Sequence, residues 1–324
     1  MQGCASVAPD PAQGYPARMS GRHRRTWYSA AVTAPLVHST PFLTADAVHV
    51  GQDLGGREVA VAAEDVTRYR AGTGGDDLPA DPAPALLYHS EVYRNLSWYL
   101  PNLIGNLHAR QEWQLFAPVR VGDAVRSRVT VVERYRKRDR DYVVAEVLWT
   151  TPEGRWLQRS RTHQSFLAAI PAADVVVDKD RERRGDRRFE LPAGPGERLP
   201  PRTRSVTHAM CEAFSGPSRN YHTDVEMARA LGFPDIVVQG MMSVCFVADA
   251  VALRFGAGWA HGGTLDVRLV NVVWPGDAVT TTGLVRSVTP EEAHERVLLD
   301  VWSTKADGTV TVIGTAGALR RRLD

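Results

Sequence analysis

The stretch Val119-Arg-Val-Gly-Asp-Ala-Val125 occurs a second time in the chain, with two changes, as Val273-Trp-Pro-Gly-Asp-Ala-Val279. The glycines of the two stretches are 154 residues apart, and a second pair of turn glycines, Gly154 and Gly308, keeps the same separation. A repeat of this length is too long for a solenoid unit and has the size of a domain. The sequence therefore predicts two copies of one domain in tandem.

Each copy is predicted to form a meander of antiparallel strands after its Gly-Asp turn. Alternating, β-branched runs that are separated by polar or glycine-containing turns are typical of such strands. The predicted strands are Ala124–Val132, Tyr142–Thr150 and Arg155–Leu167 in the first copy, and Ala278–Val288, Arg296–Thr304 and Thr309–Leu319 in the second.

One apolar helix is expected before each meander. In the second copy Met241–Phe255 is apolar nearly all round, which is typical of a buried helix. In the first copy the expected counterpart is Leu86–Leu100, with Pro101 as a stop signal. The predicted fold class is therefore α+β: a tandem, or double, hotdog fold in which an antiparallel sheet of each half wraps around a central helix. Because one half leaves a sheet edge uncovered, we expect an intramolecular pseudo-dimer, and further homo-oligomerisation stays open.

The expected organisation has four parts. Residues 1–34 are predicted to be a disordered tail or the product of a misplaced start codon, and 35–170 the first hotdog half. Residues 171–201, with a charge-dense run followed by prolines and glycines, are expected to be a linker. Residues 202–324 form the second half, which carries the candidate site.

Composition excludes several functional classes. The chain has 324 residues, of which 44% are hydrophobic and 23% charged, and its net charge is +2. Nothing in this balance demands nucleic acid or a membrane as a partner. The only cysteines are Cys4, Cys211 and Cys245, which are widely spaced. This spacing argues against a disulfide framework or a zinc site, and the small number of cysteines fits a cytoplasmic location. No cofactor is expected, because neither a dinucleotide fingerprint nor metal-ligand spacing occurs.

A polar run lies just upstream of the second helix. It reads Ser215-Gly-Pro-Ser-Arg-Asn-Tyr-His-Thr-Asp224, and Gly232-Phe-Pro234 and Gln239-Gly-Met241 follow it. This run resembles the MaoC-like, (R)-specific enoyl-CoA hydratase pattern, Ser-Gly-Asp-x-Asn-Pro-x-His-x-Asp, then Gly-Phe-Pro, then His-Gly-Met at the helix start. The resemblance covers the motif closely and the sheet segments loosely, from about Pro41 to the end.

The resemblance implies an acyl-thioester site. In that family an Asp and a His act together on a water and on the α-proton of a thioester, and a backbone N–H at the helix N-terminus holds the thioester oxygen. His222 falls on the catalytic His and Gly240 on the glycine that faces the oxyanion. The family Asp, however, is Pro217 here, and the His of His-Gly-Met is Gln239.

The resulting hypothesis is a hydro-lyase of the enoyl-CoA hydratase or 3-hydroxyacyl dehydratase type. Its substrate would be an α,β-unsaturated or 3-hydroxy acyl thioester of coenzyme A or a carrier protein, in fatty acid or polyketide metabolism. The predicted catalytic residues are His222 as acid and base, Asn220 and Asp224. Asp224 or Asp235 could stand in for the family Asp that is missing at Pro217. The predicted oxyanion or substrate-binding residues are Gly240, Gln239, Arg219, Ser218 and Tyr221.

Three other interpretations stay open. The site could have been diverted to another biosynthetic reaction, or the protein could be a non-catalytic thioester-binding or partner subunit. Thioester hydrolysis would need an acid on the helix, where Asp249 is available but far along.

In the first half, Gly72–Asp77 echoes the motif without a histidine at the right distance, and His89 is expected on the helix. The first half is therefore predicted to be degenerate and to shape the acyl pocket.

Overall fold

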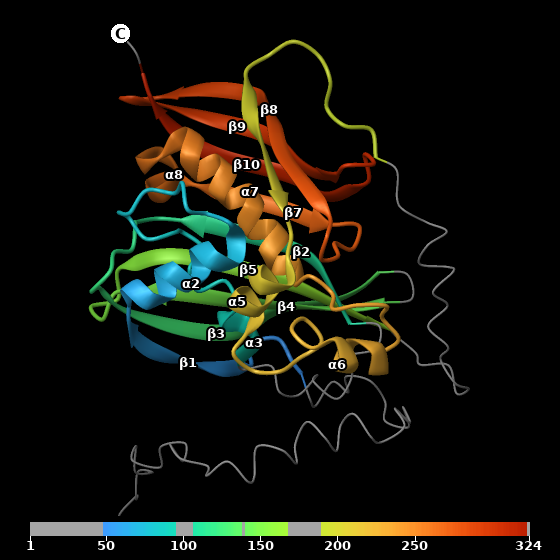
Figure 1. The fold of residues 1–324 in the computed structure, drawn as a ribbon. Coiled ribbons are helices and arrows are strands. Elements are labelled where there is room, and N and C mark those ends of the chain that lie inside the picture. The colour runs from blue at the N-terminus through green and yellow to red at the C-terminus, as the bar shows by residue number, and fades with distance from the viewer. Residues whose placement is uncertain (1–47, 95–105, 138–139, 168–188, 323–324) are drawn as a thin grey trace, which may run out of the picture. The chain divides into compact units, whose positions relative to one another are not determined.

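The computed structural model describes residues 48–94, 106–137, 140–167 and 189–322 (Figure 1). The predicted tail 1–34 and most of the predicted linker 171–201 lie outside these ranges, so the boundaries of the four parts stay predictions. None of the helices in the described ranges is long and apolar enough to cross a membrane.

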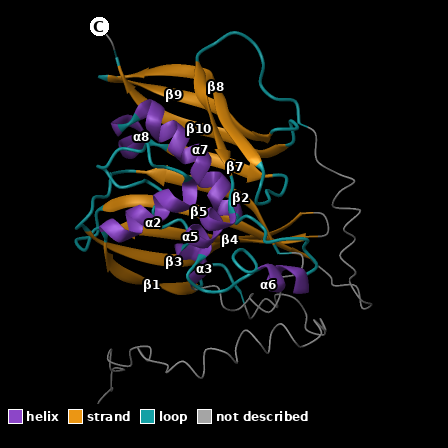
Figure 2. Cartoon of the chain, viewed as in Figure 1, coloured by secondary structure: helices purple, strands orange, loops and turns teal. Residues whose placement is uncertain are grey.

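The described strands are hydrogen-bonded into one antiparallel sheet, drawn in orange in Figure 2. They are β1 (Asp53–Ala60), β2 (Leu107–Leu115), β3 (Ala124–Lys137), β4 (Arg140–Thr150), β5 (Trp156–Leu167), β6 (Arg198–Ser205), β7 (Thr264–Leu269), β8 (Ala278–Glu291), β9 (His294–Lys305) and β10 (Val310–Arg321). Their order is β1-β3-β4-β5-β2-β7-β10-β9-β8-β6. All six predicted strands are confirmed, within a few residues at their ends.

This order reads the same from both edges, because each half contributes five strands in the same sequence. The two Gly-Asp turns are also the same in detail. Gly122 and Gly276 both have φ +94°, and Asp123 and Asp277 each accept a 2.8 Å hydrogen bond from the backbone N–H three residues earlier. Glycine is favoured at a position with positive φ because glycine has no Cβ. The predicted duplication is therefore confirmed by the backbone.

The halves join where β2 of the first pairs with β7 of the second, from Arg110 opposite Arg268 to Gln114 opposite Thr264. A bidentate ion pair crosses this seam, with Arg110 Nε and Nη2 each 2.6 Å from a carboxylate oxygen of Asp266. The predicted pseudo-dimer is thus a continuous sheet within one chain.

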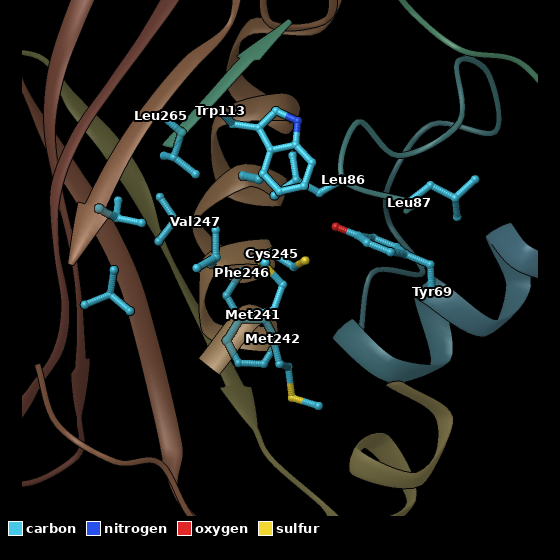
Figure 3. Packing of buried hydrophobic residues seen from close by; sticks show 14 of the residues in the cluster. Tyr69, Leu86, Leu87, Trp113, Met241, Met242, Cys245, Phe246, Val247 and Leu265 are labelled. Carbon is cyan, nitrogen blue, oxygen red and sulfur yellow. The ribbon is translucent and has the colours of Figure 1, made fainter. Parts of the chain in front are cut away.

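Six helices occur in the described ranges, and most lie on one side of the sheet in Figure 1. They are α2 (Ala63–Thr73), α3 (Glu91–Arg94), α5 (His208–Ser215), α6 (Val225–Ala230), α7 (Gly240–Phe255) and α8 (Ala257–Gly262). Helix α7 is the predicted buried helix, with every residue from Met241 to Val251 buried. Figure 3 shows its core side chains, and Tyr69 of α2 pointing its hydroxyl toward it.

The helix predicted at Leu86–Leu100 is wrong over residues 86–90 and is found only at Glu91–Arg94 among the described residues. Turns occupy 85–90, the helix is limited to Glu91–Arg94, and 95–100 lie outside the described ranges. Hydrogen bonds of the turn type replace helical ones, for example from Leu87 N–H to Pro84 C=O at 3.0 Å. The buried Glu91 carboxylate then ties this segment to Arg57 at 2.9 Å. His89 accordingly lies in the turns and not on a helix.

Strand β6 begins inside the predicted linker. Pro200 and Pro201 favour a linker in the sequence, but β6 lies at the edge of the sheet and pairs only with β8. An edge strand tolerates proline because one of its sides needs no N–H donors. The register also shifts between Leu199 and Arg202, so the two prolines fall where the ladder is interrupted.

Candidate functional site

The candidate site is built on the loop between α5 and α6. Both helices are capped by side chains: Thr207 accepts from the N–H of Met210, and Asp224 from the N–H of Met227. Such caps satisfy N–H groups that have no partner within the helix. The Asp224 cap fixes one end of the loop that carries His222, and the hydrogen bond from Gly216 N–H to the Glu212 carbonyl at 2.8 Å fixes the other end.

His222 is held in one tautomer. Its Nδ1 lies 2.6 Å from the carbonyl oxygen of Val237, and a carbonyl only accepts, so Nδ1 carries the proton. The lone pair is therefore on Nε2, for which no partner occurs among the described residues. Burial lowers the pKa of His222 to about 4, although the hydrogen bond to Val237 acts in the opposite direction. At neutral pH this imidazole is uncharged and can accept a proton at Nε2.

Asn220 positions the histidine through the backbone. Its Oδ1 accepts from the N–H of His222 at 2.8 Å, and its Nδ2 donates to the carbonyls of Ser215 and Ser218 at 3.0 and 2.9 Å. All polar atoms of this side chain are thus engaged within the loop. The structure places Asn220 as a loop anchor, and Ser218 contributes to it through its carbonyl.

The acidic candidates point elsewhere. Asp224 caps α6 and forms an ion pair with the exposed Arg219. Asp235 lies 3.1 Å from Nε2 of His208 and also accepts from its own neighbour, Ile236 N–H. Within the described ranges no carboxylate contacts His222. The role that the family assigns to an Asp is therefore not filled by either of the predicted stand-ins.

Gly240 opens α7 beside the loop. Its N–H is one of those that a helix leaves without an intrahelical acceptor, and no acceptor for it occurs in the described part of the chain. The preceding Gln239 accepts from the Ser215 hydroxyl at 3.0 Å, which ties the helix start to the loop. The positive end of the helix dipole adds to the attraction for a negative oxygen.

Tyr221 lies between the loop and the interior. Its ring centroid is 3.9 Å from that of His222, and burial raises the pKa of its hydroxyl to about 12. Pro217, Ser218 and Arg219 are exposed. The structure therefore places Tyr221 against His222 and ties both to Val237 shortly before α7. It leaves Arg219 and Ser218 at the surface.

Sequence reasoning did not identify the residues of the first half that lie beside Gly240. A Cβ built on Gly240 would lie 3.4 Å from Nδ1 of His108, a residue of β2. His108 in turn contacts the hydroxyl of Tyr93 at 3.3 Å and Oε1 of Gln111 at 3.0 Å. Neither motif nor spacing connects these residues to His222, because their proximity depends on the pairing of the two halves.

The other acid considered, Asp249, occupies a separate buried cluster on α7. It accepts from the Tyr69 hydroxyl at 2.7 Å and from Arg204 at 3.3 Å. Burial raises its pKa to about 6. Cys211 and Cys245 are fully buried, and burial raises the pKa of the Cys211 thiol to about 11. No group of metal-ligating side chains occurs among the residues that the structure describes.

Comparison with known proteins identifies the site-bearing half. Residues 193–303 match the family model described as MaoC like domain. This part of the second half is therefore similar to that family. No curated protein sequence matches the chain.

Solved structures extend the likeness beyond the MaoC-like domain to nearly the whole chain. A MaoC-like dehydratase from Phytophthora capsici is 16% identical, with a TM-score of 0.63 over 87% of this chain and 99% of that one. A putative MaoC domain protein dehydratase from Chloroflexus aurantiacus is 13% identical, with a TM-score of 0.61 over 89% and 99%. A conserved hypothetical protein of Mycobacterium tuberculosis, described as having a double hotdog fold, is 13% identical, with a TM-score of 0.55 over 86% of this chain and 98% of that one. The predicted double hotdog fold is confirmed.

Proposed function

We propose that this protein is a hydratase or dehydratase of an acyl thioester, bound to coenzyme A or to a carrier protein, in fatty acid or polyketide metabolism. The observation that carries the proposal is the fixed tautomer of His222. Its Nδ1–H is held by the carbonyl of Val237, which precedes α7 in the chain, so Nε2 is kept as a proton acceptor. The scarcity of cysteines supports a cytoplasmic setting.

The proposed hydration needs one acid–base group and one oxyanion donor. His222 Nε2 takes a proton from water as the water oxygen bonds to the β-carbon of an enoyl thioester. The electron pair of the double bond moves toward the thioester oxygen, which the Gly240 N–H stabilises. The α-carbon then takes a proton from the imidazolium, and the double bond has gained one water. Dehydration is the same path in reverse.

With its low pKa, His222 can act as the base in this path only when substrate is bound. A base with a pKa of about 4 is weak at neutral pH. The negative charge that develops on the thioester oxygen favours the imidazolium, because an opposite charge nearby raises the pKa of histidine. Proton transfer from water is therefore tied to the presence of the enolate.

The remaining predicted residues take supporting roles in this proposal. Asn220 and Asp224 hold the loop and α6 in place, and Gln239 joins the helix start to the loop. Tyr221 supplies an apolar ring beside the imidazole. Arg219 is at the surface, where it can meet a phosphate of the carrier only after releasing Asp224.

A second candidate is a non-catalytic thioester-binding or partner subunit. The observation that favours it is the absence of a carboxylate next to His222 within the described ranges. Thioester hydrolysis has less support, because the Asp249 carboxylate is bound by Tyr69 and Arg204 in a cluster of its own.

The test is hydration of a panel of trans-2-enoyl thioesters, from short to aromatic, followed by loss of the enoyl absorbance. His222→Asn keeps an N–H for Val237 but offers no basic nitrogen, and His222→Ala removes both. We expect kcat to fall by about 10²- to 10⁴-fold in both variants, which is the usual contribution of general acid–base catalysis. His208→Asn, which removes the neighbouring exposed imidazole, is the control. A folded wild-type protein that binds thioesters but hydrates none of them would establish the non-catalytic reading.

A further inference from the structure

The site of the second half has a neighbour from the first half whose orientation depends on a β-bulge. In β2, Gln111, Trp113 and Leu115 are buried on one face of the sheet, and by strict alternation His108 would point to the other face. The register between β2 and β5 shifts between His108 and Arg110. A bulge of this kind redirects the side chain that precedes it. As a result His108 shares a face with Gln111 and bonds to it at 3.0 Å.

The hydrogen bonds of His108 determine its tautomer. Gln111 Oε1 also accepts from the Thr162 hydroxyl at 2.9 Å, while Gln111 Nε2 donates to the Glu112 carbonyl at 3.1 Å. The oxygen of this amide therefore faces the imidazole, and His108 Nε2 donates to it. The Nδ1 lone pair is left for the hydroxyl of Tyr93.

His108 and Tyr93 are directed at the start of α7. A Cβ on Gly240 would lie 2.4 Å from Leu269 and 3.4 Å from His108 Nδ1, so the imidazole of His108 lies beside Gly240. The Tyr93 hydroxyl also hydrogen-bonds to the side chain of Gln164 and interacts electrostatically with Tyr221, the neighbour of His222 in the chain. It therefore contacts the imidazole that lies beside Gly240.

We propose that the Tyr93 hydroxyl, aimed by His108, is a second hydrogen-bond donor to the thioester oxygen, beside the Gly240 N–H. This inference rests on the proposed function and assigns the first half a part in it. No covalent bond changes at Tyr93: the hydroxyl rotates from His108 Nδ1 to the substrate oxygen and keeps its proton. At 3.3 Å its contact with His108 is long for a hydrogen bond, so little is lost in the exchange.

The acidity of the two groups suits a donor that keeps its proton. Burial, with a contribution from Tyr221, raises the pKa of Tyr93 far above its usual value. Burial also lowers the pKa of His108 to about 4, so the imidazole does not remove the proton of the hydroxyl by charging itself at neutral pH. Tyr93 is therefore a hydrogen-bond donor and not a general acid, and His108 is a positioning residue.

The test combines kinetics with the spectrum of a bound cinnamoyl-CoA. A donor to the thioester oxygen polarises the conjugated carbonyl and shifts its absorption to the red. We expect Tyr93→Phe to lose most of this shift and about 10²-fold in kcat, with a smaller change in KM, as for removal of one oxyanion donor. His108→Leu is expected to lose part of both, and His108→Asn, which restores an acceptor for the hydroxyl, to recover them.

Tyr135→Phe is the matched control. Its hydroxyl contacts His163 Nδ1 at 3.2 Å, and His163 lies between Thr162 and Gln164 in β5, so it points to the opposite face of the sheet. An unchanged shift in a folded Tyr93→Phe variant would overturn the inference, as would an equal loss in Tyr135→Phe or a wild type that gives no shift or binds no thioester. A wild type that shows the shift and loses it in Tyr93→Phe, but hydrates nothing, would support the donor and refute the hydratase.

Discussion

Replacing His89 by phenylalanine is expected to make the folded protein less sensitive to acid. His89 is 8% exposed, and its ring is stacked on Phe214 with centroids 3.9 Å apart and planes 10° from parallel. Burial, with a contribution from the charge of Arg68, lowers its pKa to about 3. In the unfolded chain the same imidazole has a pKa of about 6.5. Between these two values the unfolded state binds a proton that the folded state does not.

The sign and size follow from that difference in bound protons. The free energy of unfolding rises with pH wherever the unfolded state holds more protons, so the stability that a neutral His89 allows is lost as pH falls below 6.5. At pH 5 the solution is about 1.5 pH units below the pKa of this imidazole in the unfolded chain. At roughly 1.4 kcal/mol per pH unit, protonation of the unfolded state lowers the free energy of unfolding by about 2 kcal/mol. Phenylalanine keeps the stacked ring and cannot titrate.

The assay is urea-induced unfolding of both proteins at pH 8, 6.5, 5.5 and 5, followed by circular dichroism. Between pH 8 and 5 the wild type should lose about 2 kcal/mol more than His89→Phe. Asp249, whose raised pKa gives stability below pH 4 that is lost as pH rises toward 6, is present in both proteins and cancels. His294→Asn, which removes an exposed imidazole, controls for the substitution itself. Parallel pH dependences of wild type and His89→Phe would refute the reasoning.

Two further predictions concern the site and the repeat. Because the pKa of His222 is lowered to about 4, kcat/KM for enoyl thioester hydration should persist at pH 5 to 6 and fall only as pH drops through about 4; a fall centred near 6.5 in protein shown to be folded would contradict it. Gly122→Ala and Gly276→Ala should each lower the free energy of unfolding by about 1 to 2 kcal/mol, because both residues have φ +94° in open surroundings. Urea titrations that give a clear cost for one and none for the other would contradict the equivalence of the two turns.

The repeated Gly-Asp turn was enough to predict most of the sheet. Its backbone requirement is local: a positive φ that favours glycine, followed by an aspartate that accepts from the N–H three residues earlier. The alternating runs after it predicted six strands correctly, because a strand with one buried face shows its period in the sequence. The first-half helix was predicted wrongly, since short apolar runs do not distinguish a helix from a series of turns.

The site was predictable only where its chemistry is contiguous in the chain. The loop with His222 and the helix start at Gly240 could be found from the motif, whereas the partners of each candidate acid could not. The positions of Asp224 and Asp235 in the chain do not distinguish them from catalytic carboxylates. Their engagement with Arg219 and His208 is a property of the folded loop.

What the sequence alone determined is the duplicated architecture, and it also singled out His222 as the candidate residue. What only the tertiary structure decided is which residues of the first half lie beside the start of α7. Tyr93 and His108 are more than 110 residues from His222 in the chain. His108 reaches Gly240, and Tyr93 reaches His108, because β2 pairs with β7 across the seam and because one extra residue in β2 redirects His108. The physical reason is that register and bulges arise from pairing between distant strands, and no local pattern of side chains specifies them.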